Sequence, residues 1–351
     1  MSQRSSADET LPLRTLPILE HWDCRQCGQC CRGLAVSLDR EDVRRLREQG
    51  WARRPEFRHL RTLCRRGLWK PAYQLGKRLD GTCVFLSSDG LCRIHKEYGQ
   101  QAKPRLCRAF PVQVVPLKDF AFVTLRRCCP AAAAGLGRPI LLQRDEVRRM
   151  AELRRARPLE LPPPVIPGHR RSWQDTLRVA ETLERLVLDG RFPLVRRLVH
   201  GLGLCTTLLS CRLSQLDSQQ LGELLDILQT SVVEESDVWF RRRRAPGRLG
   251  AILFSGIASD YLRVHPRMAH DGTWAGRFRL FRVIAAVGWR RKRIPPLGPG
   301  FSGAGREALD RPLGRLPGSV LDPLTAYFET AAASKQYAFC LLYTSPSPRD
   351  S

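Results

Sequence analysis

"HWDCRQCGQCCRG", residues 21–33, places four cysteines within eight positions. Two thiols that are separated by two residues can bind one cation, because the short loop between them brings the sulfurs within a few ångströms. The run C-x2-C-x2-C-C holds more thiols than a single zinc knuckle requires. We therefore expect these cysteines to bind a metal, and the metal to stabilise a small domain that begins here.

Further cysteines extend the set toward the middle of the chain. Cys83, Cys92 and Cys107 each fall in a short expected element, and Cys129 precedes Pro130, as the remote cysteine of bacterial ferredoxins precedes a proline. If residues 128 and 129 continue a strand, only one of them can face the cluster, and we favour Cys129. The predicted metal ligands are Cys24, Cys27, Cys30, Cys31, Cys83, Cys92, Cys107 and Cys129.

A ligand set made of sulfur alone suits both zinc and iron–sulfur centres. The seven or eight thiolates exceed one four-thiolate zinc site, which favours an iron–sulfur cluster, although two zinc ions would also use them. His95, three residues after Cys92, is expected to be a surface or core histidine rather than a ligand or a donor behind the ligands. Cys64, Cys205 and Cys211 are expected to be structural thiols.

Short mixed elements are expected in the cysteine-rich part. Asp39 is placed to cap a helix that Gly50 ends, and Pro104 can start a helical turn that carries Cys107. A turn at 88–90 should lead into another short helix. The stretch 51–78 is basic and is expected to be irregular. The expected strands are 82–86, 112–117 and 121–129, the last two forming a hairpin.

Beyond a Pro-rich stretch the apolar residues recur at helical spacing. One such stripe runs from Trp173 to Gly190, and Ser218 is expected to cap a second helix with an apolar face of leucines. We predict an α+β fold, with a small metal-stabilised cysteine-rich N-terminal domain followed by a mainly α-helical region. The predicted parts are a flexible lead-in (1–20), the metal-binding domain (21–154), a Pro-rich linker (155–171), a truncated helical domain (172–339) and a non-native tail (340–351).

The net charge of +25 raises the question of a nucleic-acid partner. Only seven of the 59 basic residues are lysines, and such an arginine excess is also produced by the codon bias of a GC-rich genome. A basic solvated surface is therefore favoured over a polyanion-binding one, and "RRRR" at 241–244 is expected to be a solvated loop or helix end rather than an anion site.

No run of 18 apolar residues occurs, which excludes a membrane-spanning helix on sequence grounds. The first twenty residues lack the apolar core of a secretory signal. We therefore expect a cytoplasmic protein, in which thiols stay reduced and clustered cysteines bind metal instead of forming disulfides.

Three stretches, "CRQCGQCC", "CVFLSSDGLCRIH" and "KPRLCRAFP", together resemble the YkgJ-type cysteine-cluster family of zinc- or iron-chelating domains. The resemblance covers about residues 22–135. It implies that the cysteines of the motif chelate the metal, namely Cys24, Cys27, Cys30, Cys31, Cys83, Cys92 and Cys107.

The longer stretch "GLCRIHKEYGQQAKPRLCRAFPV", followed by "CCPAAA", is similar to flagellin lysine N-methylases. This likeness implies S-adenosylmethionine as a cofactor, and flagellin or another surface protein as the substrate. No glycine-rich nucleotide-binding loop accompanies it, so catalytic and cofactor-binding residues stay unassigned. Three functions remain open: a metal-binding protein, a protein-lysine methylase, or a zinc-stapled nucleic-acid-associated protein. The sequence does not define the oligomeric state.

Overall fold

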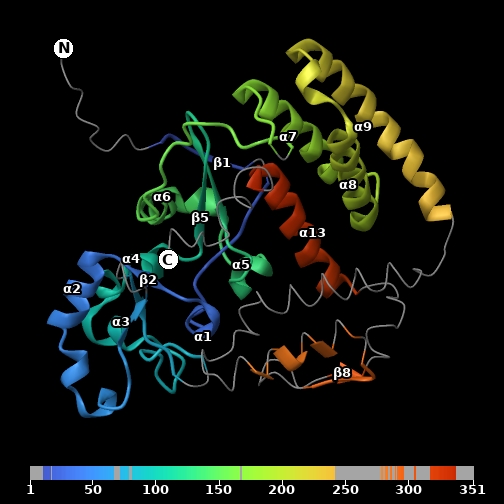
Figure 1. The fold of residues 1–351 in the computed structure, drawn as a ribbon. Coiled ribbons are helices and arrows are strands. Elements are labelled where there is room, and N and C mark those ends of the chain that lie inside the picture. The colour runs from blue at the N-terminus through green and yellow to red at the C-terminus, as the bar shows by residue number, and fades with distance from the viewer. Residues whose placement is uncertain are drawn as a thin grey trace, which may run out of the picture. The chain divides into compact units, whose positions relative to one another are not determined.

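The computed structural model describes residues 11–16, 18–66, 72–78, 81–166, 168–241 and 317–336, with short pieces between 278 and 305. The chain divides into two units, each assembled from segments that are distant in sequence. The helical unit consists of 1–24, 108–243 and 317–351, and the cysteine unit consists of 25–107 and 244–316. Strands gather in the N-terminal part and helices dominate the C-terminal part, which confirms the α+β prediction (Figure 1).

Aromatic side chains form the centre of the cysteine unit. Trp51 and Phe57 are almost fully buried, and their ring centroids lie 5.3 Å apart in an edge-to-face arrangement. Phe85 completes the group, with its ring 5.2 Å from that of Trp51. Such contacts add to the free energy of burying the rings, so the core can support short elements around it. These elements are α1 (Gln29–Gly33), α2 (Arg40–Glu48), α3 (Arg93–Tyr98), α4 (Arg105–Ala109), β2 (Ser37–Leu38), β3 (Leu63–Arg66) and β4 (Ala72–Leu75).

The helix expected after Asp39 is confirmed as α2. The Asp39 side chain accepts the backbone N–H of Asp42 at 2.8 Å, and Gly50 takes the left-handed conformation with φ 68° just beyond the helix. The turn at 88–90, the helix that follows it (α3) and the helical turn that carries Cys107 (α4) are also confirmed.

Two expectations for this part are wrong. Residues 82–86 form a turn rather than a strand, because only the ends of the stretch pair, Cys83 with Lys77 and Leu86 with Cys92, as isolated bridges. The stretch 51–78 is not irregular throughout, since it contributes two strands to a sheet of order β2-β4-β3. Its consecutive arginines hide the alternation of buried and exposed residues by which a strand is recognised.

A second sheet lies in the helical unit. Strands β5 (Val112–Pro116) and β6 (Ala121–Leu125) are antiparallel, with Val114 opposite Val123, so the predicted hairpin is confirmed. Strand β1 (Leu13–Thr15) pairs in parallel with β6. Residues 13–15, which lie in the expected lead-in, therefore form an edge strand of this sheet.

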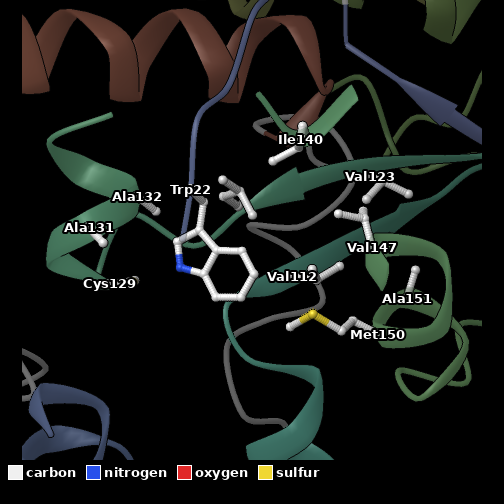
Figure 2. Close-up of a cluster of buried hydrophobic side chains, with 11 residues drawn as sticks. Trp22, Val112, Val123, Cys129, Ala131, Ala132, Ile140, Val147, Met150 and Ala151 are labelled. Carbon is white, nitrogen blue, oxygen red and sulfur yellow. The ribbon is translucent and has the colours of Figure 1, made fainter. Parts of the chain in front are cut away.

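Trp22 lies in the hydrophobic core that packs beside this sheet. Figure 2 shows its indole ring between Val112 and Met150 on one side and Ala132 on the other, all of them buried. The short helices α5 (Pro130–Ala133) and α6 (Arg144–Glu152) supply the alanines and the methionine of this cluster.

Helices α7 (Trp173–Leu188), α8 (Leu194–Ser210), α9 (Ser218–Arg241) and α13 (Gly318–Ala333) form the rest of the helical unit (Figure 1). Leu204, Leu213 and Leu221 are each at most 1% exposed where α7, α8 and α9 pack together. The two predicted helices are confirmed, although the cap of α9 differs by one residue. Asp217, not Ser218, accepts the N–H groups of the first turn, and Gln220 accepts the Asp217 N–H in return.

The remaining described elements are short. None of the helices in the described part of the chain is long and apolar enough to cross a membrane. Arg242 to Arg244 and the predicted tail at 340–351 lie outside the described residues. The short elements are the 3-10 turns Trp51–Arg53, Pro55–Phe57, Gln100–Ala102, Ile140–Gln143 and Leu213–Gln215, and strands β7 (Arg293–Ile294) and β8 (Ala304–Gly305).

Candidate metal centre

The cysteines of the cysteine unit occupy the starts of short helices and one turn. Cys30 and Cys31 lie in α1, Cys92 is the N-cap of α3, and Cys107 is the third residue of α4. Cys83 begins the turn that leads toward Cys92.

Two backbone contacts join the CxxCxxCC run to the later cysteines. The N–H of Cys83 donates to the carbonyl oxygen of Cys31 at 2.7 Å. Gly28 has φ +65°, and a Cβ atom at this position would lie 2.8 Å from the carbonyl oxygen of Gly90. The loop before α1 therefore rests directly on the turn between Cys83 and Cys92, and only glycine fits there.

The candidate ligands lie on the rim of the aromatic core. Phe85 and Ile94 are each 1% exposed, and they belong to the same two segments as Cys83 and Cys92. Cys83, Cys92 and Cys107 are half-buried and pack against this core. Burial of the apolar neighbours thus holds the sulfur-bearing segments in place.

The side chain of Arg78 holds the turn between Cys83 and Cys92. Its Nη2 atom donates to the carbonyl oxygen of Leu86 at 2.8 Å and to that of Val84 at 3.3 Å. These charge-assisted bonds add to the backbone bonds within the turn, such as that from the N–H of Ser87 to the carbonyl oxygen of Leu91, and they restrict how far Cys83 and Cys92 can move apart.

The thiols are close enough to change one another's ionisation. The Sγ atoms of Cys30 and Cys31 lie 4.0 Å apart. Their hydrogen bond lowers the pKa of Cys30 to about 6 and raises the pKa of Cys31 above its usual range. Burial raises the pKa of Cys83 to about 11 and that of Cys107 above its usual range, and negative charge on Cys83, Cys92 and Cys30 raises the pKa of Cys107 further.

Cations flank the same thiols. Lys103 lowers the pKa of both Cys30 and Cys107, and Lys77 and Arg78 lower that of Cys83, in each case against the larger effect of burial. Burial in turn lowers the pKa of Lys77. These side chains can offset part of the negative charge that several thiolates carry when they bind one metal.

The donor set suits zinc or iron. Two sulfurs of a tetrahedral zinc site with bonds of about 2.3 Å lie about 3.8 Å apart, and the Cys30–Cys31 separation of 4.0 Å is close to this value. Among the described residues, no three side chains of Cys, His, Asp or Glu already have the spacing of a metal site. Binding therefore requires the thiols to close around the ion, since thiolates repel one another until a cation compensates their charge.

Comparison with known families supports this assignment. Residues 23–130 match the CxxCxxCC family model, described as "Putative zinc- or iron-chelating domain". This stretch is therefore similar to zinc- or iron-chelating CxxCxxCC domains, and we refer to residues 23–130 as the CxxCxxCC domain. The matched range contains all eight predicted ligands. Neither the search of curated proteins nor the search of solved structures found a match.

Three other predicted ligands of the CxxCxxCC domain differ from this group in burial or in the unit to which they belong. Cys27 is exposed in the loop that precedes α1 in the cysteine unit. Cys24 is exposed and Cys129 is buried, and both belong to the helical unit. The eight-residue set as a whole stays a prediction.

Cys128 and Cys129 do not continue a strand, so the alternation of strand side chains, on which the choice of Cys129 over Cys128 rests, does not apply to them. Strand β6 ends at Leu125, a turn follows, and Cys129 is the N-cap of α5. Its side chain packs in the core around Trp22 (Figure 2). The physical reason is Pro130, which starts a helical turn and so prevents the strand from continuing.

The other candidates have positions that agree with non-ligand roles. His95 is exposed in the last turn of α3, as expected of a surface histidine. Cys64 lies on β3, Cys205 is exposed on α8, and Cys211 packs against the leucine core at the end of α8.

Sequence reasoning missed Gly28, Arg78 and the lysines beside the thiols. Gly28 carries a signal, because a glycine between two close cysteines marks a backbone that needs a left-handed residue. Arg78 carries none, because arginines are frequent throughout the chain and only the folded backbone shows which ones lie beside the thiols. Lys77 and Lys103 carry none because neither stands at a spacing from a cysteine that predicts contact.

Proposed function

We propose that the CxxCxxCC domain binds zinc or an iron–sulfur centre through thiolates drawn from Cys30, Cys31, Cys83, Cys92 and Cys107. One observation carries the proposal: these thiols come from four separate segments that the fold brings together. The N–H of Cys83 donates to the carbonyl oxygen of Cys31 at 2.7 Å, and Cys83, Cys92 and Cys107 pack against the same aromatic core. Thiols that merely fill a core have no reason to gather in this way. Four thiolates are enough for one closed zinc site or one cubane cluster.

The environment of the thiols supports a site that forms together with the metal. Burial and mutual repulsion keep Cys83 and Cys107 protonated without a cation. A bound dication reverses this balance, because its charge stabilises the thiolates, and binding then releases protons. Metal affinity is therefore expected to rise with pH.

Anaerobic purification of the full chain tests the proposal and identifies the metal. Iron with acid-labile sulfide and a brown colour identifies an iron–sulfur centre, which the number of thiols favours. A colourless protein with one or two equivalents of zinc identifies a zinc site. A protein that holds neither metal in near-stoichiometric amount, and takes up neither on reconstitution, contradicts the proposal.

Single substitutions test the ligands. We expect Cys83→Ser and Cys107→Ser to lose most of the bound metal, since each removes a thiolate from the group. Cys205→Ser is the matched control, because this thiol is exposed on α8 in the helical unit. Equal metal content in all three variants would exclude Cys83 and Cys107 as ligands.

A further inference from the structure

A buried carboxylate on α2 faces the helix that carries Cys107. Asp42 is 1% exposed, and its Oδ1 atom accepts the backbone N–H of Arg105 at 2.9 Å. The Nη2 atom of Arg45 donates to the same oxygen at 2.6 Å. Burying a carboxylate is costly unless it is paired and hydrogen-bonded, and Asp42 has both kinds of partner.

A second carboxylate of the same turn holds the side chain of Arg105. The Nε atom of Arg105 donates to Oδ2 of Asp39 at 2.9 Å. The other oxygen of Asp39 accepts the N–H of Asp42 and so caps α2. The backbone and the side chain of Arg105 are thus both fixed to the first turn of α2, two residues before Cys107.

Helix α4 needs such support because it has only five residues. A helix of this length is unstable by itself, since the cost of starting it exceeds the gain from its few hydrogen bonds. Cys107 N–H donates to the carbonyl oxygen of Pro104 within this single turn. The direction of the Cys107 thiol therefore follows the position of Arg105.

We propose that Asp42 is a positioning residue, which aims the Cys107 thiolate at the metal by holding the first residue of α4. The inference rests on the proposed metal-binding function. Groups behind the ligands in metal sites orient them in this way, and their loss typically weakens metal affinity by about 10- to 100-fold.

The test compares Asp42→Ala, Asp42→Asn and Glu41→Gln in the full-length protein loaded with zinc. Asn keeps an oxygen that can accept the Arg105 N–H, so it should restore part of what Ala loses. Glu41 is the matched control, because it neighbours Asp42 on α2 and lies 3.7 Å from Arg45, but its side chain is 56% exposed. Two quantities are measured: zinc affinity by competition with a chelator, and alkylation of each cysteine by mass spectrometry.

We expect Asp42→Ala to weaken zinc binding by about 10- to 100-fold. At saturating zinc, Cys107 should become open to alkylation while Cys83 and Cys92 stay protected, which a general loss of structure would not produce. Asp42→Asn should fall between Asp42→Ala and the wild type, and Glu41→Gln should match the wild type.

Unchanged zinc affinity together with full protection of Cys107 in Asp42→Ala overturns the inference. If Asp42→Ala exposes every cysteine to alkylation, the Asp42→Asn variant distinguishes the two explanations. Exposure of every cysteine in Asp42→Asn as well would show that Asp42 stabilises the fold in general and would overturn the inference. If zinc and iron fail to protect any cysteine of the wild type, the proposed function itself fails, and this outcome is distinct from the other two.

Discussion

Gly28 shows how one residue couples the two halves of the candidate centre. Its left-handed backbone and its contact with the carbonyl oxygen of Gly90 let the CxxCxxCC loop lie on the 83–92 turn. Gly50 has nearly the same φ, 68° against 65°, but a Cβ there would meet nothing within 4 Å. Alanine substitutions at the two positions can therefore distinguish the free-energy cost of a left-handed backbone, which arises at both, from the cost of a steric overlap, which arises only at Gly28.

We predict that Gly50→Ala lowers the free energy of unfolding by about 1–2 kcal/mol, the cost of a left-handed alanine. Gly28→Ala should lower it by about 1–3 kcal/mol more, because the added methyl group overlaps the backbone of Gly90. Gly28→Ala should also weaken zinc binding, and Gly50→Ala should not. Urea unfolding and zinc titration of the two variants check this, and equal losses in both would show that the contact is unimportant.

Glu20 is a second residue whose environment can be tested. Its carboxylate is buried and accepts from Arg127 Nη2 and Thr124 Oγ1, both at 3.1 Å. Arg127 also donates to the carbonyl oxygen of Ala132 and to Oγ1 of Thr330, so one ion pair connects segments from both ends of the helical unit. Burial raises the pKa of Glu20, although Arg127 lowers it in part.

A raised native pKa means that the folded protein binds this proton more tightly than the unfolded chain does. The stability that Glu20 contributes is therefore full below about pH 4.3, the ordinary glutamate pKa, and is lost as the pH rises through the native pKa. We predict that the wild type loses stability relative to Glu20→Gln as the pH rises through the native pKa of Glu20. Urea unfolding between pH 4 and pH 7 measures it, with the exposed Glu152→Gln as a control that shows no such trend.

At the scale of elements, caps decide where helices begin. Asp217 accepts the N–H groups of Gln219 and Gln220, both at 2.8 Å, and Gln220 accepts the Asp217 N–H at 2.9 Å. This reciprocal pair satisfies donors that the first turn of α9 would otherwise leave without partners. Ser218 instead donates to the buried Asp175 of α7, so its hydroxyl joins two helices and does not cap α9.

We predict that Asp217→Ala destabilises the helical unit by about 1 kcal/mol, the usual loss for an N-cap. Asp226→Ala, at an exposed position in the middle of the same helix, should change stability by less than about 0.5 kcal/mol. Thermal unfolding followed by circular dichroism compares the two variants. A larger effect at Asp226 would mean that the capping pair does not hold α9.

At the scale of the whole molecule, the two units differ in what stabilises them. The helical unit buries rows of leucines between long helices. The described helices of residues 25–107 in the cysteine unit have five to nine residues and surround a small aromatic core, so bound metal should supply a larger share of the stability of this part.

We predict that chelation of the metal speeds amide exchange in the cysteine unit and leaves the helical unit protected. The Cys83 and Arg105 amides are the reporters, since their hydrogen bonds join the ligand-bearing segments. Hydrogen–deuterium exchange with and without chelator measures this, and added zinc should restore the protection. Equal loss of protection in α7 and α9 would show that the metal stabilises the chain as a whole.

Local patterns predicted much of the fold. The apolar stripes of α7 and α9, the cap at Asp39 and the β5–β6 hairpin follow from neighbouring residues alone. The strands β3 and β4 did not, because the consecutive arginines of β3 hide its alternation and the pairing of β4 with β2 joins residues that are distant in sequence. The prediction of a strand at 82–86 is wrong, because a short run of apolar residues does not specify whether its backbone extends or forms a turn.

The sequence by itself determined that this protein carries a thiol-rich domain of the zinc- or iron-chelating type, because cysteine spacing is a local property that a metal constrains directly. Only the tertiary structure decided which thiols lie together. Cys30, Cys31, Cys83, Cys92 and Cys107 share one electrostatic environment, while Cys129 packs in the core around Trp22. The sequence gives the identity and local spacing of the cysteines. Which thiols come close together depends on packing between distant segments, such as the contact of Gly28 with Gly90 and that of Asp42 with Arg105.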